Sequence, residues 1–464
     1  MRVYAGIRWF IPLFAALLWA GIVPQNVIAA KCPCDYYADG GTPCVAAHSM
    51  VRALYSSYNG HLYQIKRVSD KKTIEIGVLT AGGAANTAPQ DSFLTGTTGR
   101  ISIIYDQSDK GNDLVPTPFG SYWEPEDTAA NPADAKIKLN GHTVYGMYTY
   151  GSFNSTPSDT THKGVGYRNN KAKGLATGNA AEGMYMVCDA KHYNAWCCFD
   201  YGNAETNGID DGAATMECIY YGSSTQFEHC GGTGPWIRND MENGMSCGAE
   251  KTDTSNHSID YKNINFLTAI VKGKATNWYS IKGGDAQKGK LKVIYAGHRP
   301  SNAGGSGADY YPLKLQGGIV LGTGGDNSHS GIGTFFEGAI TIGCPPDSTE
   351  DSVQANIVAA GFGSSVTMTR RGGNEAETSS RIKVNFNPQT ESAVIDYALQ
   401  DARRVNVKIV DQRGRRVAEI AGGVMAAGSH EAIWDTKQVP AGVYFWRMTL
   451  NGRDERAGKI IVEK

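Results

Sequence analysis

Short segments of alternating apolar and polar residues recur along this chain, and glycine-containing turns separate them. Arg100–Asp106 and Gly183–Asp189 are two clear examples. The chain has 57 glycines and 24 tyrosines but few long apolar runs with helical spacing, a combination typical of many short strands joined by tight turns. The sequence therefore predicts an all-β fold of the β-sandwich type, with one short helix after Cys44, over residues 45–58.

Length and charge limit the organisation of the chain and the class of its partner. A chain of 464 residues is too long for one ordinary domain, so two or more domains are expected. The 44 basic and 45 acidic residues leave a formal net charge of -1. That balance provides no electrostatic reason to expect nucleic acid or an anionic membrane, so we expect a neutral partner.

The N-terminus has the pattern of a secretory signal peptide over residues 1–30. An apolar stretch from Trp9 to Val23 follows basic residues, and the small residues Ala29 and Ala30 offer a cleavage point. A membrane anchor is the alternative reading. It is disfavoured because Pro12 interrupts the stretch, which is also shorter than the roughly 20 residues of a bilayer span.

Cysteine usage agrees with export. All ten cysteines lie between Cys32 and Cys344, as in a disulfide-stabilised domain. Cys34 and Cys44 bracket a turn segment and are placed to close a local loop. The spacings do not match a zinc site, so no metal is expected. The sequence leaves open the partners of six cysteines, which are Cys32, Cys188, Cys218, Cys230, Cys247 and Cys344.

Composition divides the rest of the chain into three parts. Residues 31–360 have one continuous composition and form the main domain. Residues 361–380 are polar and glycine-rich without periodicity, which predicts a linker. Residues 381–464 predict a small second β-domain, with alternating strands over 381–386, 393–399, 405–411, 430–435, 442–450 and 458–463.

Two segments of the main domain carry acidic residues in an unusual setting. In GPWIRNDMENG, Asp240 and Glu242 stand two apart, so that an extended chain projects them from one face. In GGIVLGTGGDNS, an apolar strand runs into glycines and delivers Asp326. Two carboxylates from separate segments are what glycoside hydrolysis requires. For Asp326 taken by itself, a turn residue that caps its own backbone is the favoured explanation.

The C-terminal segments FNPQTESAVIDYAL, VKIVDQRGRRVAEI, AGSHEAIWD and PAGVYFWRM resemble the immunoglobulin-like sorting domains of bacterial secreted proteins, including those of the type IX secretion route. The resemblance implies that secretion machinery is a partner and that the protein is secreted or attached to the cell surface. A generic β-sandwich spacer is the alternative.

The main domain resembles the catalytic domain of α-L-arabinofuranosidase B, glycoside hydrolase family 54. The segments that carry the resemblance include CDYYADGGTPCVAAHS, HYNAWCCFDYGNAETN, GPWIRNDMENG, GGIVLGTGGDNS and SVQANIVAA, in the order of the family. The resemblance implies a concanavalin-like β-sandwich that releases terminal α-L-arabinofuranosyl residues from arabinoxylan and arabinan with retention. No cofactor is expected, and we expect a monomer.

The resemblance also implies roles for individual residues. Glu242 falls on the nucleophile of the family and Asp326 on its acid/base, a pair that sits about 5 Å apart in a retaining enzyme. The family's sugar-contacting positions match Asp240, Asn243, Gly244 and Gly325.

Cys197 and Cys198 match a vicinal disulfide that faces the sugar, although each could instead pair with another strand. Phe227 stands near the place of a family tryptophan beside the substrate.

Other carboxylates and other classes of function remain as alternatives. Glu205 and Glu217 are candidates for supporting positions behind the site, whereas Asp106 is explained as a strand-end turn residue. The chain could also be a carbohydrate-binding sandwich without activity, or a surface adhesin. The presence of both carboxylates favours the enzyme.

Overall fold

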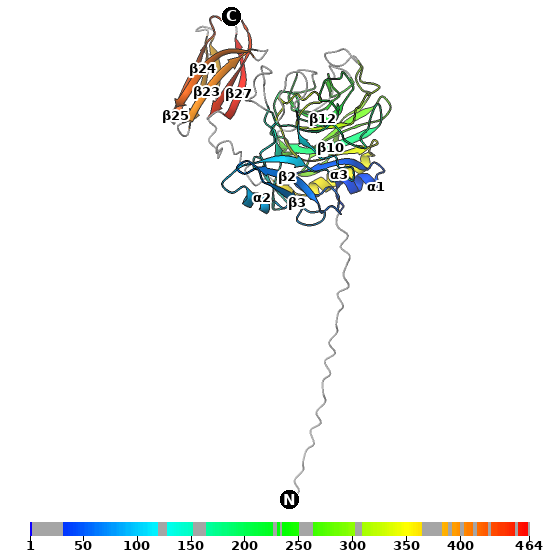
Figure 1. Cartoon of the computed structure of the whole chain (residues 1–464). Coiled ribbons are helices and arrows are strands. Elements are labelled where there is room, and N and C mark those ends of the chain that lie inside the picture. Colours follow the sequence, from blue (N-terminus) through cyan, green and yellow to red (C-terminus); the bar gives the residue numbers. More distant parts are fainter. Residues whose placement is uncertain are drawn as a thin grey trace.

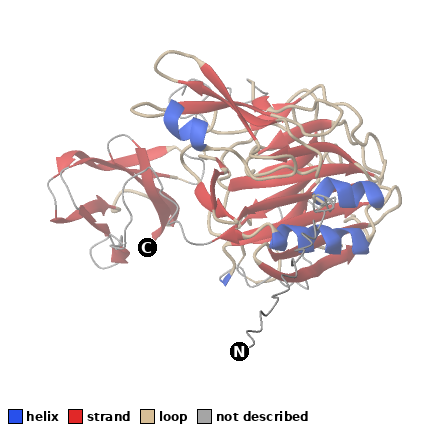
Figure 2. Ribbon diagram, turned by 90° about the horizontal axis from the view of Figure 1, so that it is seen from below, coloured by secondary structure: helices blue, strands red, loops and turns tan. Residues whose placement is uncertain are grey.

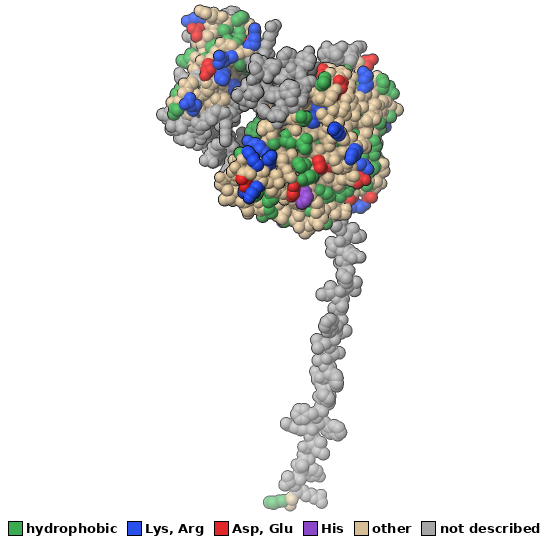
Figure 3. Space-filling view, in the orientation of Figure 1, with side chains coloured by type: hydrophobic (Ala, Val, Ile, Leu, Met, Phe, Trp, Pro, Cys, Tyr) green, Lys and Arg blue, Asp and Glu red, His purple; other side chains and the backbone are tan. Residues whose placement is uncertain are grey.

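The computed structural model describes residue 1 and the ranges 31–118, 128–151, 164–225, 230–232, 234–249, 263–301, 309–363, 383–387, 392–399, 403–411, 415–425, 428–450 and 453–462. The expected signal peptide and nearly all of the expected linker lie outside these residues. Within the described part of the chain, no helix has the length and apolar character needed to cross a membrane. The face seen in Figure 3 carries acidic and basic side chains interspersed, in keeping with the near-zero net charge.

Two antiparallel sheets form the main domain, each with seven strands among the described residues. The first, called the back sheet, has the order β1 (Cys44–Ser49), β19 (Thr334–Ile342), β10 (Glu182–Asp189), β15 (Phe266–Gly273), β16 (Tyr279–Asp285) and β17 (Lys288–Gly297), with β8 (Met147–Tyr148) beside β19. The second, called the front sheet, has the order β14 (Met245–Ser246), β13 (Trp236–Asp240), β12 (Glu217–Gly222), β11 (Asp200–Ala204), β18 (Gly318–Leu321), β9 (Tyr167–Asn169) and β5 (Val115–Pro116). Figure 1 places β10 and β12 in the centre of this domain.

The two sheets bury one continuous apolar core between them. Tyr185 and Ile270 of the back sheet belong to the same buried cluster as Tyr201, Ile219 and Ile237 of the front sheet. Side chains alternate between the two faces of a strand, so the neighbouring positions of the front sheet point away from this core. The outer face of the front sheet is therefore the surface on which polar side chains gather.

Smaller elements surround the sandwich. Two three-stranded sheets have the orders β3 (Thr73–Gly77), β2 (His61–Arg67), β4 (Gly99–Ile104) and β20 (Phe362–Gly363), β6 (Lys136–Leu139), β7 (His142–Tyr145). Three helices, α1 (Pro33–Asp39), α2 (Ala88–Phe93) and α3 (Asp347–Ala359), lie at the periphery of the strands (Figure 2). The described residues are thus all-β in architecture, as the sequence predicts.

The helix expected over residues 45–58 is wrong. β1 occupies its first part, pairs antiparallel with β19, and buries all six of its residues. A short apolar run suits a buried strand as well as a buried helix, because periodicity alone does not separate the two. The helix of this region is instead α1, where Pro33 stands in the first turn and the Asp35 carboxylate accepts the Cys32 N–H (2.8 Å).

The C-terminal part is a second small β-structure. A three-stranded sheet of order β21 (Lys383–Asn387), β22 (Ser392–Leu399), β25 (Gly428–Asp435) accompanies a four-stranded sheet of order β24 (Arg416–Met425), β23 (Arg403–Val410), β26 (Gly442–Leu450), β27 (Arg453–Val462) (Figure 1). Each of the six expected strands has a counterpart. β24 was not expected, because the Ala-Gly-Gly run at Ala421 signals a turn, whereas the structure keeps it extended beside a register shift in β23.

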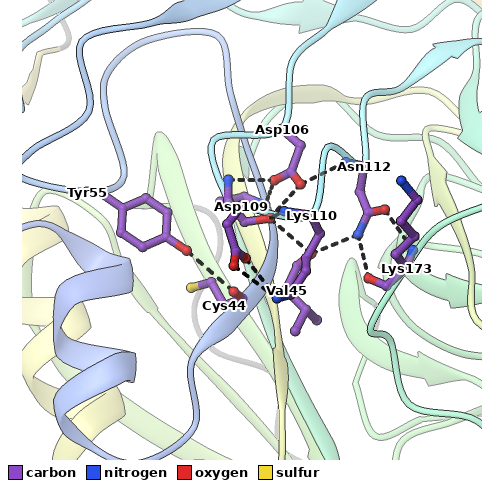
Figure 4. Close-up of polar contacts among 10 residues, drawn as sticks. Cys44, Val45, Tyr55, Asp106, Asp109, Lys110, Asn112 and Lys173 are labelled. Carbon is purple, nitrogen blue, oxygen red and sulfur yellow. Dashed lines mark hydrogen bonds and ion pairs between the residues drawn. The ribbon is translucent and has the colours of Figure 1, made fainter.

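Asp106 organises a loop, as the sequence predicts. Its Oδ1 accepts the N–H groups of Ala47 (2.8 Å) and Ser108 (2.9 Å), and its Oδ2 accepts the N–H of Asn112 (2.8 Å). The Asn112 amide in turn donates to the carbonyl oxygens of Val45 (2.8 Å) and Lys173 (2.9 Å), as Figure 4 shows. These bonds occupy the carboxylate, which therefore serves the fold.

The structure joins Cys34 to Cys44, Cys197 to Cys198, and Cys230 to Cys247. The last bridge, which the sequence left open, ties the segment before β13 to the segment after β14. Cys188 on β10 and Cys218 on β12 are buried thiols.

A buried ion pair fastens the segment that follows β1 to strand β19 and provides a test of the fold. Arg52 donates to both carboxylate oxygens of Glu337 (2.6 and 2.7 Å), and Glu337 is fully buried. Arg52→Met would leave that carboxylate buried without its cation, so we expect the free energy of unfolding to fall by about 3–5 kcal/mol. Urea denaturation followed by tryptophan fluorescence measures the change.

The matched control is Arg67→Met, which breaks an ion pair with Asp70 at the surface and should leave the unfolding midpoint nearly unchanged. Arg52→Met/Glu337→Leu removes both charges and should recover much of the lost stability. Equal destabilisation by the Arg52 and Arg67 variants would contradict this account.

Candidate active site

The hairpin between β13 and β14 presents the first acidic group. β13 and β14 pair directly through Asp240 and Met245, and Glu242 and Asn243 are the central residues of the connecting turn. Both have positive φ angles, 64° and 57°. A two-residue hairpin of the I′ type requires positive φ at both positions and normally uses Asn or Gly there. A glutamate in this conformation is a strained choice, and such residues concentrate at functional sites.

The loop after β18 presents the second acidic group. The Ser328 N–H donates to Asp326 Oδ1 (2.8 Å), so Asp326 does cap its own turn, as its sequence setting suggested. Asn327 beside it has a φ of 68°. Arg168 on β9 is buried and donates to the Gly325 carbonyl (2.9 Å) and to the Asn327 side chain. This guanidinium therefore fixes the backbone that carries Asp326.

The bonded pair Cys197–Cys198 lies between these two loops. Cys198 Sγ is 3.6 Å from Asp240 Oδ2 on the hairpin side and 3.4 Å from Ser328 Oγ on the other. The Cys197 carbonyl accepts the N–H groups of Ser330 (2.9 Å) and Gly331 (3.0 Å). The disulfide is thus held against both acidic segments.

The three segments enclose one pocket of about 100 Å³. Eight of the residues singled out in the sequence line it, namely Cys197, Cys198, Asp240, Glu242, Asn243, Gly244, Gly325 and Asp326. Phe227, the ninth, lies outside the described residues. Strand β13 and the loop after β18 are far apart in sequence, and the front sheet brings them to one side.

Sequence reasoning missed four further lining residues, Asp210, Met245, Gly324 and Ser328. Asp210 accepts a hydrogen bond from the Asn243 amide (2.9 Å) but belongs to a polar loop that carries no recognisable signal. Glu205 lies directly behind Gly325, as a supporting position would. Glu217 does not approach the pocket, because it lies between the sheets and pairs with Arg299 (3.1 Å).

Burial and mutual repulsion govern the charges of the pocket. Burial, followed by repulsion from Glu205, Asp326 and Asp240, raises the pKa of Glu242 to about 11. Burial likewise raises the pKa of Asp240 to about 7 and that of Glu205 to about 7. At neutral pH the pocket is therefore expected to hold fewer negative charges than carboxyl groups.

Gly325 allows the loop to approach Glu205, which suggests a test of the geometry. A methyl group at Gly325 would overlap the Glu205 carboxyl and come within 2.9 Å of Met216 Sδ. Gly325→Ala should therefore displace the loop that carries Asp326, and a shift of this kind lowers kcat/KM by roughly a hundredfold. Steady-state kinetics with a chromogenic substrate of the glycoside class that the sequence predicts measures the loss. Gly363→Ala is the control, since its nearest neighbour would be Lys138 Cβ at 3.4 Å, and unchanged activity in Gly325→Ala would contradict the prediction.

Comparison with known proteins places this pocket in a family. A family model described as "Alpha-L-arabinofuranosidase B, catalytic" matches residues 33–363. The chain belongs to this family. The matched segment contains both loops and the disulfide of the pocket. A second model, "Secretion system C-terminal sorting domain", matches residues 384–463, which indicates a protein that is secreted or held at the cell surface.

Individual relatives of this arabinofuranosidase B family member support the family assignment. A probable α-L-arabinofuranosidase B of Aspergillus terreus is 50% identical over 347 residues, which cover 74% of this chain and 64% of that protein. An "Arabinofuranosidase/B-xylosidase" of Trichoderma koningii is 48% identical over 75% of this chain and 66% of that protein. This chain thus spans slightly less than two thirds of the length of these relatives.

A solved arabinofuranosidase in complex with arabinofuranosyl-α-1,2-xylobiose is also similar. It has a TM-score of 0.67 and 43% identity, covering 83% of this chain and 76% of that chain. A family 54 α-L-arabinofuranosidase soaked with a cyclic sulfate inhibitor has the same TM-score and identity, over 80% of this chain and 73% of that one. The arabinofuranosidase B family member described here therefore shares its main fold with these enzymes.

Proposed function

We propose that this protein is a secreted retaining α-L-arabinofuranosidase that releases terminal non-reducing α-L-arabinofuranosyl residues from arabinoxylan, arabinan or their oligosaccharides. The observation that carries the proposal is the meeting of Glu242 and Asp326 in one small pocket, from two separate loops. Membership of the arabinofuranosidase B family and the names of the relatives support the choice of sugar.

In the proposed reaction, Glu242 is the nucleophile and Asp326 is the acid/base. The Glu242 carboxylate attacks the anomeric carbon while the Asp326 carboxyl protonates the departing oxygen, which leaves an arabinosyl ester on Glu242. Asp326 then removes a proton from a water molecule, and that water displaces Glu242 with a second inversion. The two inversions retain the anomeric configuration.

The ionisation of Glu242 depends on the substrate. Burial raises the pKa of Glu242 and so favours its protonated form, whereas a nucleophile must be ionised. Positive charge develops on the sugar ring in the oxocarbenium-like transition state, and a nearby cation favours the carboxylate form. The proton is therefore expected to move to another carboxyl group of the cluster as the substrate reacts.

The remaining lining residues suit recognition of one furanose ring. The Asp240 carboxylate and the Asn243 amide can accept and donate hydrogen bonds to ring hydroxyls. Gly244 and Gly325 let the backbone approach the sugar closely. The Cys197–Cys198 disulfide offers an apolar surface for the face of the ring.

The C-terminal domain supports export. We assign it to routing by a bacterial secretion system of the type IX kind, with attachment to the surface or release after sorting. The chain is expected to act as a monomer and without a cofactor.

Hydrolysis of 4-nitrophenyl α-L-arabinofuranoside by the purified chain tests the proposal. We expect nitrophenol release, and proton NMR of the first product should show the α-anomer of arabinose before mutarotation. Release of the β-anomer would exclude retention. Binding of L-arabinose without any turnover would instead identify a carbohydrate-binding sandwich.

A further inference from the structure

Asp200 is a buried carboxyl group next to the pocket that the proposed reaction does not use. It begins β11 and is fully buried. In the front sheet, Asp200 lies opposite Tyr220, while Cys218 lies opposite Gly202 on one side and Asp240 on the other. Residues two apart on a strand share a face, so Asp200 and Asp240 project from the outer face on a diagonal across Cys218.

The two carboxyl groups interact through their side chains. Both Asp200 oxygens are buried, and neither accepts a hydrogen bond from any N–H or O–H that the structure describes. Two carboxylates in contact cannot both be ionised in a buried site. One of them must therefore carry a proton, and that proton lies in the bond between them.

The other contacts decide which residue holds the proton. Asp240 Oδ1 already accepts the Glu242 N–H (3.2 Å), a bond that favours the ionised form of Asp240. Asp200 has no such donor, and the charged groups that act on it most strongly are Asp240, Asp326 and Glu205, all acidic. The buried cation on the same face, Arg238, lies over the Tyr220 ring (5.8 Å from its centroid), on the far side of that ring's strand from Asp200. Burial first, and then Asp240, raise the pKa of Asp200 well above its ordinary value.

We propose that Asp200 is a positioning residue of the arabinose site: it stays protonated and donates a hydrogen bond to Asp240, which keeps Asp240 an ionised acceptor aimed at the sugar. The inference rests on the proposed function, in which Asp240 binds a ring hydroxyl. Because Asp200 lies behind Asp240, it acts on the sugar only through that residue. The hydrogen bond from Asp200 also lowers the pKa of Asp240, opposing the effect of burial.

Two substitutions of similar size distinguish a hydrogen-bond donor at position 200 from a side chain that only fills the space. Asp200→Asn keeps an N–H that can donate to Asp240, so kcat/KM for 4-nitrophenyl α-L-arabinofuranoside should stay within about threefold of wild type. Asp200→Leu fills the space without a donor, so kcat/KM should fall roughly 10- to 100-fold, mainly through KM. The control for replacing a buried aspartate by asparagine is Asp134→Asn. Asp134 is buried outside the pocket, so this variant should leave kcat and KM unchanged.

A spectroscopic measurement tests the proton without relying on turnover or on the leucine variant. The infrared difference spectrum of wild type minus Asp200→Asn at pH 7 should contain the carbonyl band of a protonated carboxyl group, which shifts in heavy water. Absence of that band would overturn the inference. So would an Asp200→Asn variant as impaired as Asp200→Leu, or an Asp200→Leu variant with wild-type kinetics.

Failure of the proposed function has a different signature. If wild type itself neither hydrolyses the arabinoside nor binds L-arabinose, the proposed function falls, and the positioning role of Asp200 falls with it. If wild type is active, the ranking of the variants by kcat/KM and the presence of the infrared band test the positioning role of Asp200 independently of the proposed function.

Discussion

Glu242→Gln is expected to abolish turnover of 4-nitrophenyl α-L-arabinofuranoside, with kcat lower by at least on the order of a thousandfold. Glutamine keeps the size of the side chain but cannot form the arabinosyl ester. Burial raises the pKa of Glu242 to about 11, so the neutral amide resembles the protonated form of this side chain. The thermal unfolding midpoint and the affinity for the substrate should therefore change little.

The control is Asp351→Asn, an exposed acidic residue on α3, which should keep full activity. Rapid-mixing assays should show no burst of nitrophenol for Glu242→Gln, as for buffer alone. Turnover that survives Glu242→Gln would show that another carboxylate attacks the sugar, and Asp240 would be the first to examine, because it lines the same pocket.

Asp326→Asn is expected to cause a loss that depends on the leaving group. An asparagine cannot protonate the departing oxygen, so kcat/KM should fall roughly 10²- to 10⁴-fold for arabinosyl xylo-oligosaccharides, whose leaving group needs a proton. The loss should be much smaller for 4-nitrophenyl arabinoside, because nitrophenolate departs unprotonated. The amide oxygen can still accept the Ser328 N–H, so the turn should persist.

Azide provides a second readout for Asp326→Asn. It attacks the arabinosyl ester without needing a general base, so it should restore the second step and yield arabinofuranosyl azide with retained configuration. Equal losses for good and poor leaving groups, with no effect of azide, would exclude Asp326 as the acid/base.

Much of the fold could be predicted from local patterns. Strand β22 follows directly from alternating residues, because burial of one face imposes that period. Strand β10 was also predicted, although all eight of its residues are buried. The helix expected after Cys44 failed for the complementary reason: β1 is buried on both faces, and a short apolar run carries no period to read. β24 was missed because a glycine pair that usually signals a turn continues a strand beside a register shift.

Site residues that stand in a short recognisable motif could be predicted from the sequence. Residues whose role depends on contacts with segments remote in sequence could not. Glu242 and Asp326 stand in conspicuous glycine-rich strings, and both line the pocket. Arg168 and Asp200 carry no such signal. Arg168 matters because it reaches the Gly325 carbonyl from β9, and Asp200 because strand register sets it diagonal to Asp240.

The sequence by itself determined the alternation of strands, the C-terminal sorting domain, and the identity of the acidic residues in each loop. Only the tertiary structure decided which of those acids share a pocket and how they share protons. The physical reason is that pKa values respond to burial and to charges within a few ångströms, and these depend on the pairing of strands that are remote in sequence. In the sequence, Asp200 looks like any other aspartate. It becomes a hydrogen-bond donor to Asp240 only where β11, β12 and β13 meet.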